Sequence, residues 1–209
     1  MDSAADPHRI NDVATLERIY GHPAGAAVEK ELDYLHPHYK LLISKSPFVV
    51  LATGGPAGLD TSPRGDAPGF VVVEDDKTLL LPDRKGNNRI DSLRNIVADP
   101  QVALIFLIPG VGETLRVNGR ASITTSPAVL ERFRMEGALP RSVIVVKVET
   151  VFFQCSRALW RSKLWDVATQ IERSSLPSLG TMVQDISQQK IKAEVYDDNL
   201  YPRLKSTLY

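Results

Sequence analysis

Short runs of aliphatic and β-branched residues dominate the middle of the chain, and their pattern predicts strands. The runs at residues 48–53 and 102–108 are continuously apolar, and such residues favour the pleated surface of a sheet. At residues 113–123 apolar and polar side chains alternate, which predicts a strand of a sheet with one wetter face. Further strands are expected at residues 60–64, 69–74, 77–81, 142–149 and 151–155.

Helical periodicity flanks this strand-rich region on both sides. Residues 26–46 place apolar side chains at three- and four-residue steps, which predicts an amphipathic helix broken or kinked at Pro37. A similar pattern at residues 181–197 predicts a second amphipathic helix, which ends in a polar tail over residues 196–209. Shorter helices are expected at residues 13–19, 92–98 and 126–133.

The predicted fold is mainly β, of the α+β type. Six or seven strands with short connections and few intervening helices favour a closed or nearly closed antiparallel barrel over a doubly wound parallel sheet. No glycine-rich dinucleotide fingerprint stands between a strand and a helix, which disfavours a Rossmann site. We expect a helical extension packed on the barrel at residues 1–46, the barrel at 47–166, and a helix and tail at 167–209.

Composition narrows the classes of partner. The 209 residues include 25 Lys and Arg against 25 Asp and Glu, so no net field favours nucleic acid or an anionic membrane. The single cysteine cannot form an intrachain disulfide, and no apolar run reaches the roughly 20 residues of a membrane span. The first six residues lack the basic start and apolar run of a secretory signal. We therefore expect a cytoplasmic protein without nucleic acid or membrane partners.

No catalytic nucleophile or metal site is evident. His36 and His38 flank a proline two residues apart, but no further His or Cys cluster supports a metal site. Cys155 has no His near it in sequence, and an inert core cysteine is the expected reading. The catalytic residues are therefore left open, and no metal is expected.

Residues 81–95 are expected to form a strand end, a Gly/Asn turn and a helix start. Proline cannot donate to a sheet ladder, so Pro82 is expected to end the strand. Asp91 or Ser92 is expected to cap the helix that follows. Three cations occupy the turn, Arg84, Lys85 and Arg89.

A turn of this kind offers what a phosphate monoester needs. Charge-assisted hydrogen bonds from the cations add to those from two Asn side chains and from the free N–H groups of a helix start. The sequence therefore predicts a phosphate-binding turn. The alternative is a solvated surface turn whose charges only keep the protein soluble.

Two further stretches carry polar side chains on the predicted sheet. Residues 62–70 form a connection with two glycines between predicted strands and carry Arg64 and Asp66. Alternatively these two residues form a surface ion pair, which contributes little to stability. In residues 113–120 strand alternation puts Thr114, Arg116 and Asn118 on one face, which is alternatively a solvated sheet face. Trp160 and Trp165 lie beside arginines, as at interfaces or ring-stacking sites, or else belong to the core.

Together these stretches resemble the flavin-binding split-barrel proteins related to pyridoxamine 5′-phosphate oxidase. The resemblance covers about residues 46–166 and is closest to a subgroup of uncharacterised relatives. Four motifs in the same order carry it: Ser-Pro-Arg-Gly-Asp, Pro-Asp-Arg-x-Gly-Asn, Glu-Thr-Leu-Arg-Val-Asn-Gly-Arg-Ala and Arg-Ser-x-Leu-Trp-Asp. They stand here at residues 62–66, 82–87, 113–121 and 161–166.

The resemblance implies a six-stranded antiparallel split β-barrel that forms a homodimer, with FMN in a groove at the subunit interface. In such proteins basic and hydroxyl side chains on adjacent strands and the following turn hold the phosphate. The isoalloxazine ring lies along the strand that here contains residues 63–66, and the late aromatic segment often comes from the partner. The cofactor-binding residues implied are Arg64, Asp66, Arg84, Lys85, Asn87, Arg89, Ser92, Thr114, Arg116, Trp160, Arg161 and Trp165.

The expected function is that of an FMN-dependent oxidoreductase of unknown substrate. The chain lacks the basic pair that directly precedes the helix in the oxidase, and it lacks a late Arg-x-His motif, so vitamin B6 oxidation is not implied. Asp66 and Arg116 are the candidates for a proton relay. Alternatives are a non-catalytic flavin-binding or storage protein, or a split barrel that binds a deazaflavin or haem.

Overall fold

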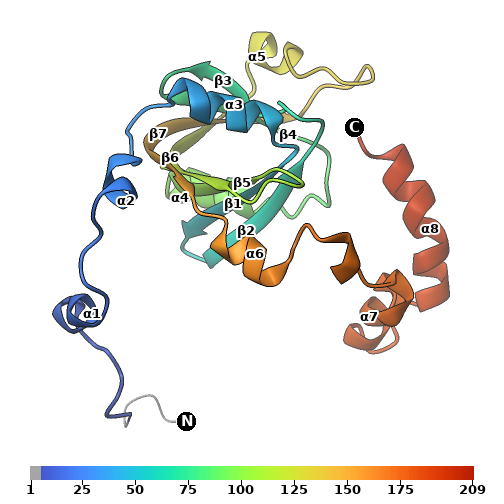
Figure 1. Ribbon diagram of the computed structural model, residues 1–209. Helices are drawn as coiled ribbons and strands as arrows, with labels where there is room; N and C mark the ends of the chain where they lie inside the picture. Colours follow the sequence, from blue (N-terminus) through green and yellow to red (C-terminus); the bar gives the residue numbers. More distant parts are fainter. Residues whose placement is uncertain (1–5) are drawn as a thin grey trace. The chain divides into compact units, whose positions relative to one another are not determined.

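The computed structural model describes residues 6–209, in two compact units (Figure 1). The first unit, which ends at Glu31, holds two short helices, α1 (Val13–Tyr20) and α2 (Ala26–Glu29). Helix α1 begins after Asp12, whose side chain accepts a hydrogen bond from the amide of Thr15 and so satisfies a free N–H group. The second unit, Leu32–Tyr209, contains the sheet and the hydrophobic core.

Seven strands form one antiparallel sheet in the order β2-β1-β5-β6-β7-β4-β3. Seven strands agree with the six or seven that the pattern predicted, whereas the six that the family resemblance implied are too few. The sheet is not closed, because β2 and β3 each keep one edge without a strand partner among the described residues. The strands are β1 (Phe48–Gly55), β2 (Gly58–Gly65), β3 (Val72–Asp75), β4 (Thr78–Asp83), β5 (Gln101–Leu107), β6 (Thr114–Thr124) and β7 (Ser142–Gln154).

The pairing of β6 with β7 bends at a bulge. The register shifts between Asn118 and Gly119, so that Gly119 pairs with Val148 while Asn118 pairs with Thr150. A Cβ atom at Gly119 would lie 2.0 Å from the carbonyl oxygen of Lys147. Only glycine fits this close approach of two backbones, which is a common use of glycine within strands.

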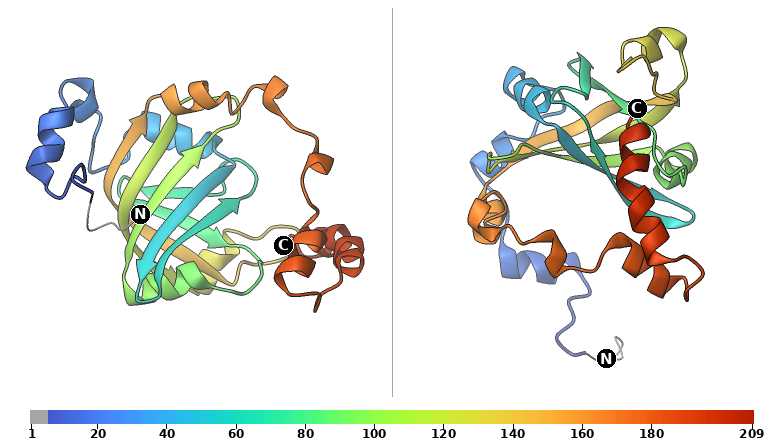
Figure 2. Two further views of the ribbon diagram at one scale, coloured as in Figure 1. Left: turned by 90° about the horizontal axis from the view of Figure 1, so that it is seen from below. Right: turned by 90° about the vertical axis from the view of Figure 1, so that its right-hand side faces the viewer.

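Six helices accompany the sheet in the second unit. They are α3 (Pro37–Lys45), α4 (Asp91–Ala98), α5 (Pro127–Glu131), α6 (Arg157–Ser162), α7 (Leu179–Ile186) and α8 (Ala193–Ser206), with short 3₁₀ turns at Val167–Thr169 and Arg173–Ser175. Figure 2 shows α7 and α8 as a helical pair joined to α6 by an extended segment. None of the helices within residues 6–209 has the length and apolar character needed to cross a bilayer.

The helix expected at residues 26–46 is two separate helices. Pro37 stands in the first turn of α3, where its missing N–H group costs nothing, and so begins a helix instead of kinking one. His36 is the N-cap residue, and its Nδ1 accepts from the amide of His38 at 3.2 Å. Leu35, Tyr39 and Ile43 of this segment belong to the core. The expected extension over residues 1–46 includes residues 1–5, which lie outside the described part.

The single helix expected at residues 181–197 is also two helices. Gln188 and Gln189 adopt positive φ angles of 53° and 67°, which end α7. The side-chain oxygen of Gln184 accepts from the amide of Ala193 at 2.8 Å, at the start of α8. The expected polar tail is helical through Ser206.

Strand β4 extends beyond Pro82, which was expected to end it. Strand β3 pairs only with residues 78–80, so on that side Pro82 has no neighbour that needs its N–H group. On the other side Pro82 and Asp83 still pair with Val143 and Ser142 of β7. The strand therefore carries its apolar residues directly to the polar residues that follow.

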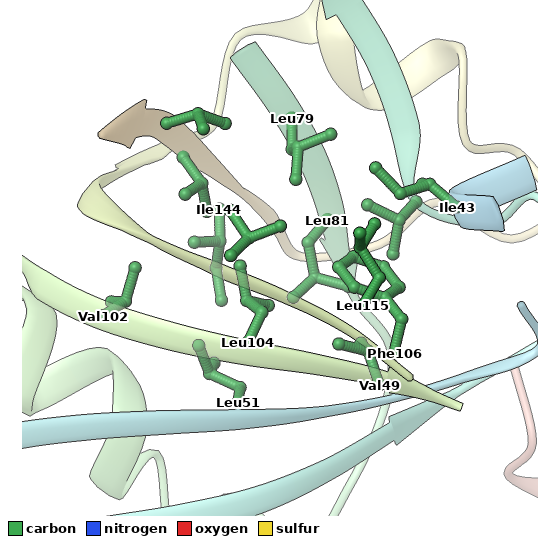
Figure 3. Close-up of a cluster of buried hydrophobic side chains, with 14 of the residues drawn as sticks. Ile43, Val49, Leu51, Leu79, Leu81, Val102, Leu104, Phe106, Leu115 and Ile144 are labelled. Atoms are coloured by element: carbon green, nitrogen blue, oxygen red, sulfur yellow. The ribbon is translucent and has the colours of Figure 1, made fainter. Parts of the chain in front are cut away.

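The core holds the two halves of the sheet together (Figure 3). Val49 and Leu51 of β1 pack with Leu79 and Leu81 of β4, and all four are fully buried. Burial of each such side chain contributes about 1.5–3 kcal/mol to folding. Leu80 points to the opposite face of β4, into a smaller cluster with Phe133 and Val143. Because both faces of β4 are packed, its end is a rigid support for the residues that follow.

Candidate functional site

A cavity of about 590 Å³ lies between β2, the end of β4, the turn that follows it, the start of α4 and the start of β7. Its volume is in the range of small-molecule sites in proteins. The lining residues are Asp60, Thr61, Ser62, Pro63, Arg64, Gly65, Phe70, Pro82, Asp83, Arg84, Lys85, Gly86, Asn87, Asn88, Arg89, Ile90, Asp91, Ser92, Leu93, Arg141 and Ser142.

Basic side chains outnumber acidic ones in this lining. Three carboxylates, those of Asp60, Asp83 and Asp91, stand against five cations. The cations are Arg64, Arg84, Lys85, Arg89 and Arg141. Because the excess charge is positive, the cavity favours an anionic ligand.

Arg64 extends from β2 toward the end of β4. Its Nη1 donates to Oδ1 of Asp83, and both side chains are less than one-fifth exposed. Its Nε is buried and has no acceptor among residues 6–209. A buried donor without a partner costs about 1–3 kcal/mol, so this nitrogen has a strong requirement for an acceptor.

Arg84 is held at three points. Its Nε donates to Oδ2 of Asp66 at 2.7 Å and its Nη1 to the carbonyl oxygen of Phe133 at 2.6 Å. Its Cζ lies 5.4 Å from the centroid of the Tyr209 ring. The Asp66 side chain is only 1% exposed and does not line the cavity. Asp66 therefore supports the cation. The alternative of a surface pair between Arg64 and Asp66 is wrong, because Arg64 pairs with Asp83 and Asp66 pairs with Arg84.

The turn after Arg84 is closed by its own side chains. The Asn87 side-chain oxygen accepts from the amide of Arg89 at 3.1 Å, and Asn88 has a φ of 61°. Arg141, at the start of β7, donates from Nη1 to the side-chain oxygen of Asn88 at 2.9 Å. Lys85 is exposed and has no ion-pair or hydrogen-bond partner within residues 6–209. Lys85 and Arg141 are thus the two lining cations without a carboxylate partner.

The start of α4 differs from the expected capped helix. Asp91 is the first helical residue, and the N-cap position is Ile90, at a φ of 53° and without a side-chain cap. Asp91 instead accepts from Nε of Arg89 at 2.7 Å, which raises the pKa of that guanidinium. Ser92 is buried and donates to Oδ2 of Asp60 at 2.5 Å. Both expected capping groups are therefore engaged by other charged side chains.

These observations can be set against known proteins. A family model described as pyridoxamine 5′-phosphate oxidase matches residues 35–155, more than half of the chain. The chain belongs to the pyridoxamine 5′-phosphate oxidase family. The resemblance inferred from the four motifs is thereby confirmed.

Solved structures of similar fold come from several bacteria. HupZ of Group A Streptococcus is 24% identical, with 58% of this chain and 94% of that chain covered and a TM-score of 0.47. A candidate pyridoxamine 5′-phosphate oxidase of Lactobacillus delbrueckii is 22% identical, with 59% and 98% covered and a TM-score of 0.46. General stress protein 26 of Bacillus anthracis is 16% identical, with 54% and 88% covered and a TM-score of 0.41. No curated protein matches the chain significantly.

Six of the site residues that the oxidase family implies line the cavity together: Arg64, Arg84, Lys85, Asn87, Arg89 and Ser92. Thr114 and Arg116 do not line it. Thr114 is buried in β6, and Arg116 lies over the ring of Phe152 at 5.1 Å. Roles for these two residues remain predictions.

The late aromatic segment of this family member also lies outside the cavity lining. Trp160 is 74% exposed on α6, so the alternative that it belongs to the core is wrong. Trp165 is half-buried, and its Nε1 donates to the carbonyl oxygen of Val111 at 2.8 Å. Arg161 is exposed on the same helix. An exposed tryptophan beside an arginine suits a contact with another chain.

Sequence reasoning missed Asp60, Asp83, Arg141, Ser142 and Tyr209. The first four line the cavity, and Tyr209 contacts Asp66 and Arg84. A signal for Ser142 exists only in the β4–β7 register, which pairs it with Asp83. That register depends on tertiary packing and is not readable from local pattern.

Proposed function

We propose that the cavity binds FMN through its phosphate, and that the protein is an FMN-dependent oxidoreductase of unknown substrate. The observation that carries the proposal is the excess of cations in the cavity lining, where Lys85 and Arg141 have no carboxylate partner among the described residues. A phosphate oxygen is the kind of acceptor that an arginine binds most strongly. Family membership supports the flavin as the group to which that phosphate belongs.

The residues present fit such a group. Arg64 and Arg84 come from two rigid strand ends and are each held by a carboxylate, so they are oriented before a ligand arrives. Lys85 and Arg141 add charge that no acidic side chain neutralises. We assign these four cations to phosphate recognition, with Asn87 shaping the turn.

Asp60 and Ser92 have a different role in this proposal from the one expected for Ser92. The serine hydroxyl already donates to the Asp60 carboxylate, and a carboxylate beside a phosphate is repulsive. We therefore place the phosphate toward Arg64, Arg84, Lys85 and Arg141, and assign no phosphate contact to Asp60 and Ser92. Arg89, paired with Asp91, contributes less.

When bound, FMN supplies the redox chemistry, and the protein supplies binding and orientation. The passage at residues 63–66 would lie along the flavin ring, as the family resemblance implies. Pro63 and Gly65 line the cavity there with little side chain between backbone and ligand. Asp66 holds Arg84 in place from behind the cavity wall.

We further propose a homodimer in which α6 meets the partner. The support is Trp160, which is 74% exposed on that helix. Helix α6 is held within its own chain at Gly112, where an added Cβ would lie 3.0 Å from Nε1 of Trp160. Size-exclusion chromatography with light scattering tests this directly. A monomer at micromolar concentration, or a dimer that persists unchanged in Trp160→Ala, would contradict the assignment of α6.

The test of cofactor binding compares FMN with riboflavin, which lacks the phosphate. The purified protein is examined by absorption spectroscopy and mass analysis of any released molecule, and the apoprotein is then titrated with both flavins. We expect FMN to bind at least about tenfold more tightly, since charged hydrogen bonds are worth about 1.5–3 kcal/mol each. Equal affinity for both flavins would overturn phosphate recognition.

Two other outcomes separate the alternatives. A flavin that binds but is not reduced by any electron donor would favour a flavin-binding or storage protein. A sharp, intense haem band in the purified protein would favour a haem protein, although the cavity lining of this chain includes no His, Cys or Met to ligate the iron. A colourless protein that binds no FMN would remove the oxidoreductase proposal.

A further inference from the structure

The end of the described chain touches the support of the anion site. Tyr209, which follows α8, donates from its hydroxyl to Oδ1 of Asp66 at 2.9 Å. Its ring stacks on Arg84, whose Cζ is 5.4 Å from the ring centroid. Figure 1 shows the chain end, marked C, returning toward the strands after α7 and α8 have run to one side of the sheet.

Asp66 is the centre of this contact. Its carboxylate accepts from the amide of Ala67 at 2.7 Å, from Nε of Arg84 at 2.7 Å and from the hydroxyl of Tyr209. The side chain is 1% exposed, so these donors replace water almost completely. A buried carboxylate needs such donors. Loss of one donor loosens the carboxylate, and the groups that remain bound to it are then held less firmly.

The contact also bears on the cavity, because Arg84 lines it while Asp66 and Tyr209 do not. Two nitrogens of Arg84 are used, Nε by Asp66 and Nη1 by the Phe133 carbonyl, which leaves Nη2 without an acceptor within residues 6–209. Tyr209 thus covers one side of an arginine whose remaining donor is available to a ligand. The hydrogen bond to Asp66 also raises the pKa of Tyr209, so its hydroxyl stays a donor at neutral and mildly alkaline pH.

We propose that Tyr209 is a positioning residue of the anion site, which fixes Asp66 and Arg84 and couples helices α7 and α8 to occupancy of the cavity. The coupling follows from linkage. If the Tyr209 contact strengthens ligand binding by some factor, the ligand strengthens the Tyr209 contact by the same factor. The binding part of this inference rests on the proposed FMN site, whereas the tethering of α8 does not.

Tyr209→Phe removes the hydroxyl and keeps the ring, and Tyr201→Phe is the matched control. Tyr201 lies on α8 and is 74% exposed. We measure FMN affinity by fluorescence titration, and hydrogen exchange of the α8 amides with and without FMN. We expect Tyr209→Phe to weaken FMN binding about three- to tenfold and to accelerate exchange in α8. FMN should slow α8 exchange in the wild type and in Tyr201→Phe, and less in Tyr209→Phe.

A second variant tests whether Tyr209 acts through Asp66. In the Asp66→Asn background the effect of Tyr209→Phe on FMN affinity should shrink, because the shared contact is already altered. Additive effects would show that Tyr209 acts through another route and would overturn the positioning role. Equal behaviour of Tyr209→Phe and Tyr201→Phe in both affinity and exchange would overturn the whole inference.

Failure of the FMN proposal is distinguishable from failure of this one. If the wild type binds neither FMN nor riboflavin, the proposed function and the coupling to it are wrong. The exchange rates of the ligand-free variants then decide on the tether alone. Faster α8 exchange in Tyr209→Phe supports it, and rates equal to those of Tyr201→Phe contradict it.

Discussion

Arg64 and Asp83 form an ion pair between strands β2 and β4, which are separated by four other strands in the sheet order. Asp66 and Arg84, the residues that directly follow these strands, form a second pair. The curled sheet thus brings its distant strands together at two ion pairs instead of a hydrogen-bonded ladder. The cavity lies at this junction, so its charged wall exists only when both strands are in place.

Removal of Arg64 should weaken FMN binding by about 1.5–3 kcal/mol, because it deletes a guanidinium that lines the cavity and its charged contact with the phosphate. Isothermal titration of Arg64→Ala measures this. Asp83→Asn is the comparison, since it keeps the guanidinium but removes the carboxylate that orients it, and it should weaken FMN binding less than Arg64→Ala does. A loss in Asp83→Asn as large as in Arg64→Ala would indicate that the ion pair matters only for structure.

Arg84 and Arg89 should differ although both stand in the same turn. Arg84 is fixed by a buried carboxylate and a carbonyl, whereas the side chain of Arg89 is 75% exposed and pairs with Asp91. We expect Arg84→Ala to cost about 1.5–3 kcal/mol of FMN binding and Arg89→Ala to have a clearly smaller effect. Flavin fluorescence titrations compare them. Equal losses of affinity would contradict this assignment and would indicate that the phosphate lies near Arg89 and the start of α4.

Lys85 and Arg141 should supply the salt-dependent part of binding. Neither has a carboxylate partner, so each retains its full charge for a ligand. Lys85→Ala and Arg141→Ala should each reduce FMN affinity by about 0.5–1.5 kcal/mol and flatten its dependence on ionic strength. Arg134→Ala is the control, because Arg134 pairs with Glu131 and does not line the cavity. An unchanged salt dependence in both variants would exclude these cations from the site.

Gly119→Ala should destabilise the fold by about 1–3 kcal/mol or more, because the added Cβ would overlap the Lys147 carbonyl. Gly86→Ala is the matched control, since a Cβ at Gly86 meets nothing within 4 Å. Urea unfolding followed by circular dichroism gives both values. Equal stability of the two variants would mean that the bulge relaxes without cost.

Stability at high pH should depend on Tyr209. Its pKa is raised in the folded protein by the hydrogen bond to Asp66, so its contribution is complete below the unfolded value near 10 and is lost as pH rises above that value. The free energy of unfolding of the wild type should therefore fall more steeply between about pH 10 and 11 than that of Tyr209→Phe. Urea melts of both proteins across this range make the comparison. Burial also raises the pKa of Tyr39, but this residue is present in both proteins, so its effect cancels. Parallel curves would contradict the contact.

Local pattern predicted the strands and the basic turn well, because both depend on neighbouring residues. Leu79 and Leu81 read as a strand and form one, and Arg84 and Lys85 line the cavity as expected. The family was also recognisable, because its four motifs are long and ordered.

The errors arise where distant segments meet. Pro82 remains in its strand because the partner on one side is short, and Ser92 does not cap its helix because Asp60 binds its hydroxyl. The contact of Tyr209 with Asp66 likewise depends on tertiary packing. Each of these outcomes is decided by a residue at least several positions away, which no local periodicity reports.

The bulge at Gly119 and the cations of the cavity differ in the substitutions they can accept. A residue with a side chain in place of Gly119 would push apart the backbones of β6 and β7, whatever the cavity binds. Lys85 and Arg141, the lining cations without a carboxylate partner, lie instead outside the strands, where a substitution alters the charge of the cavity without breaking an ion pair. Substitutions that change which ligand the cavity prefers can therefore accumulate around it, whereas Gly119 has to be kept for β6 and β7 to pair as they do.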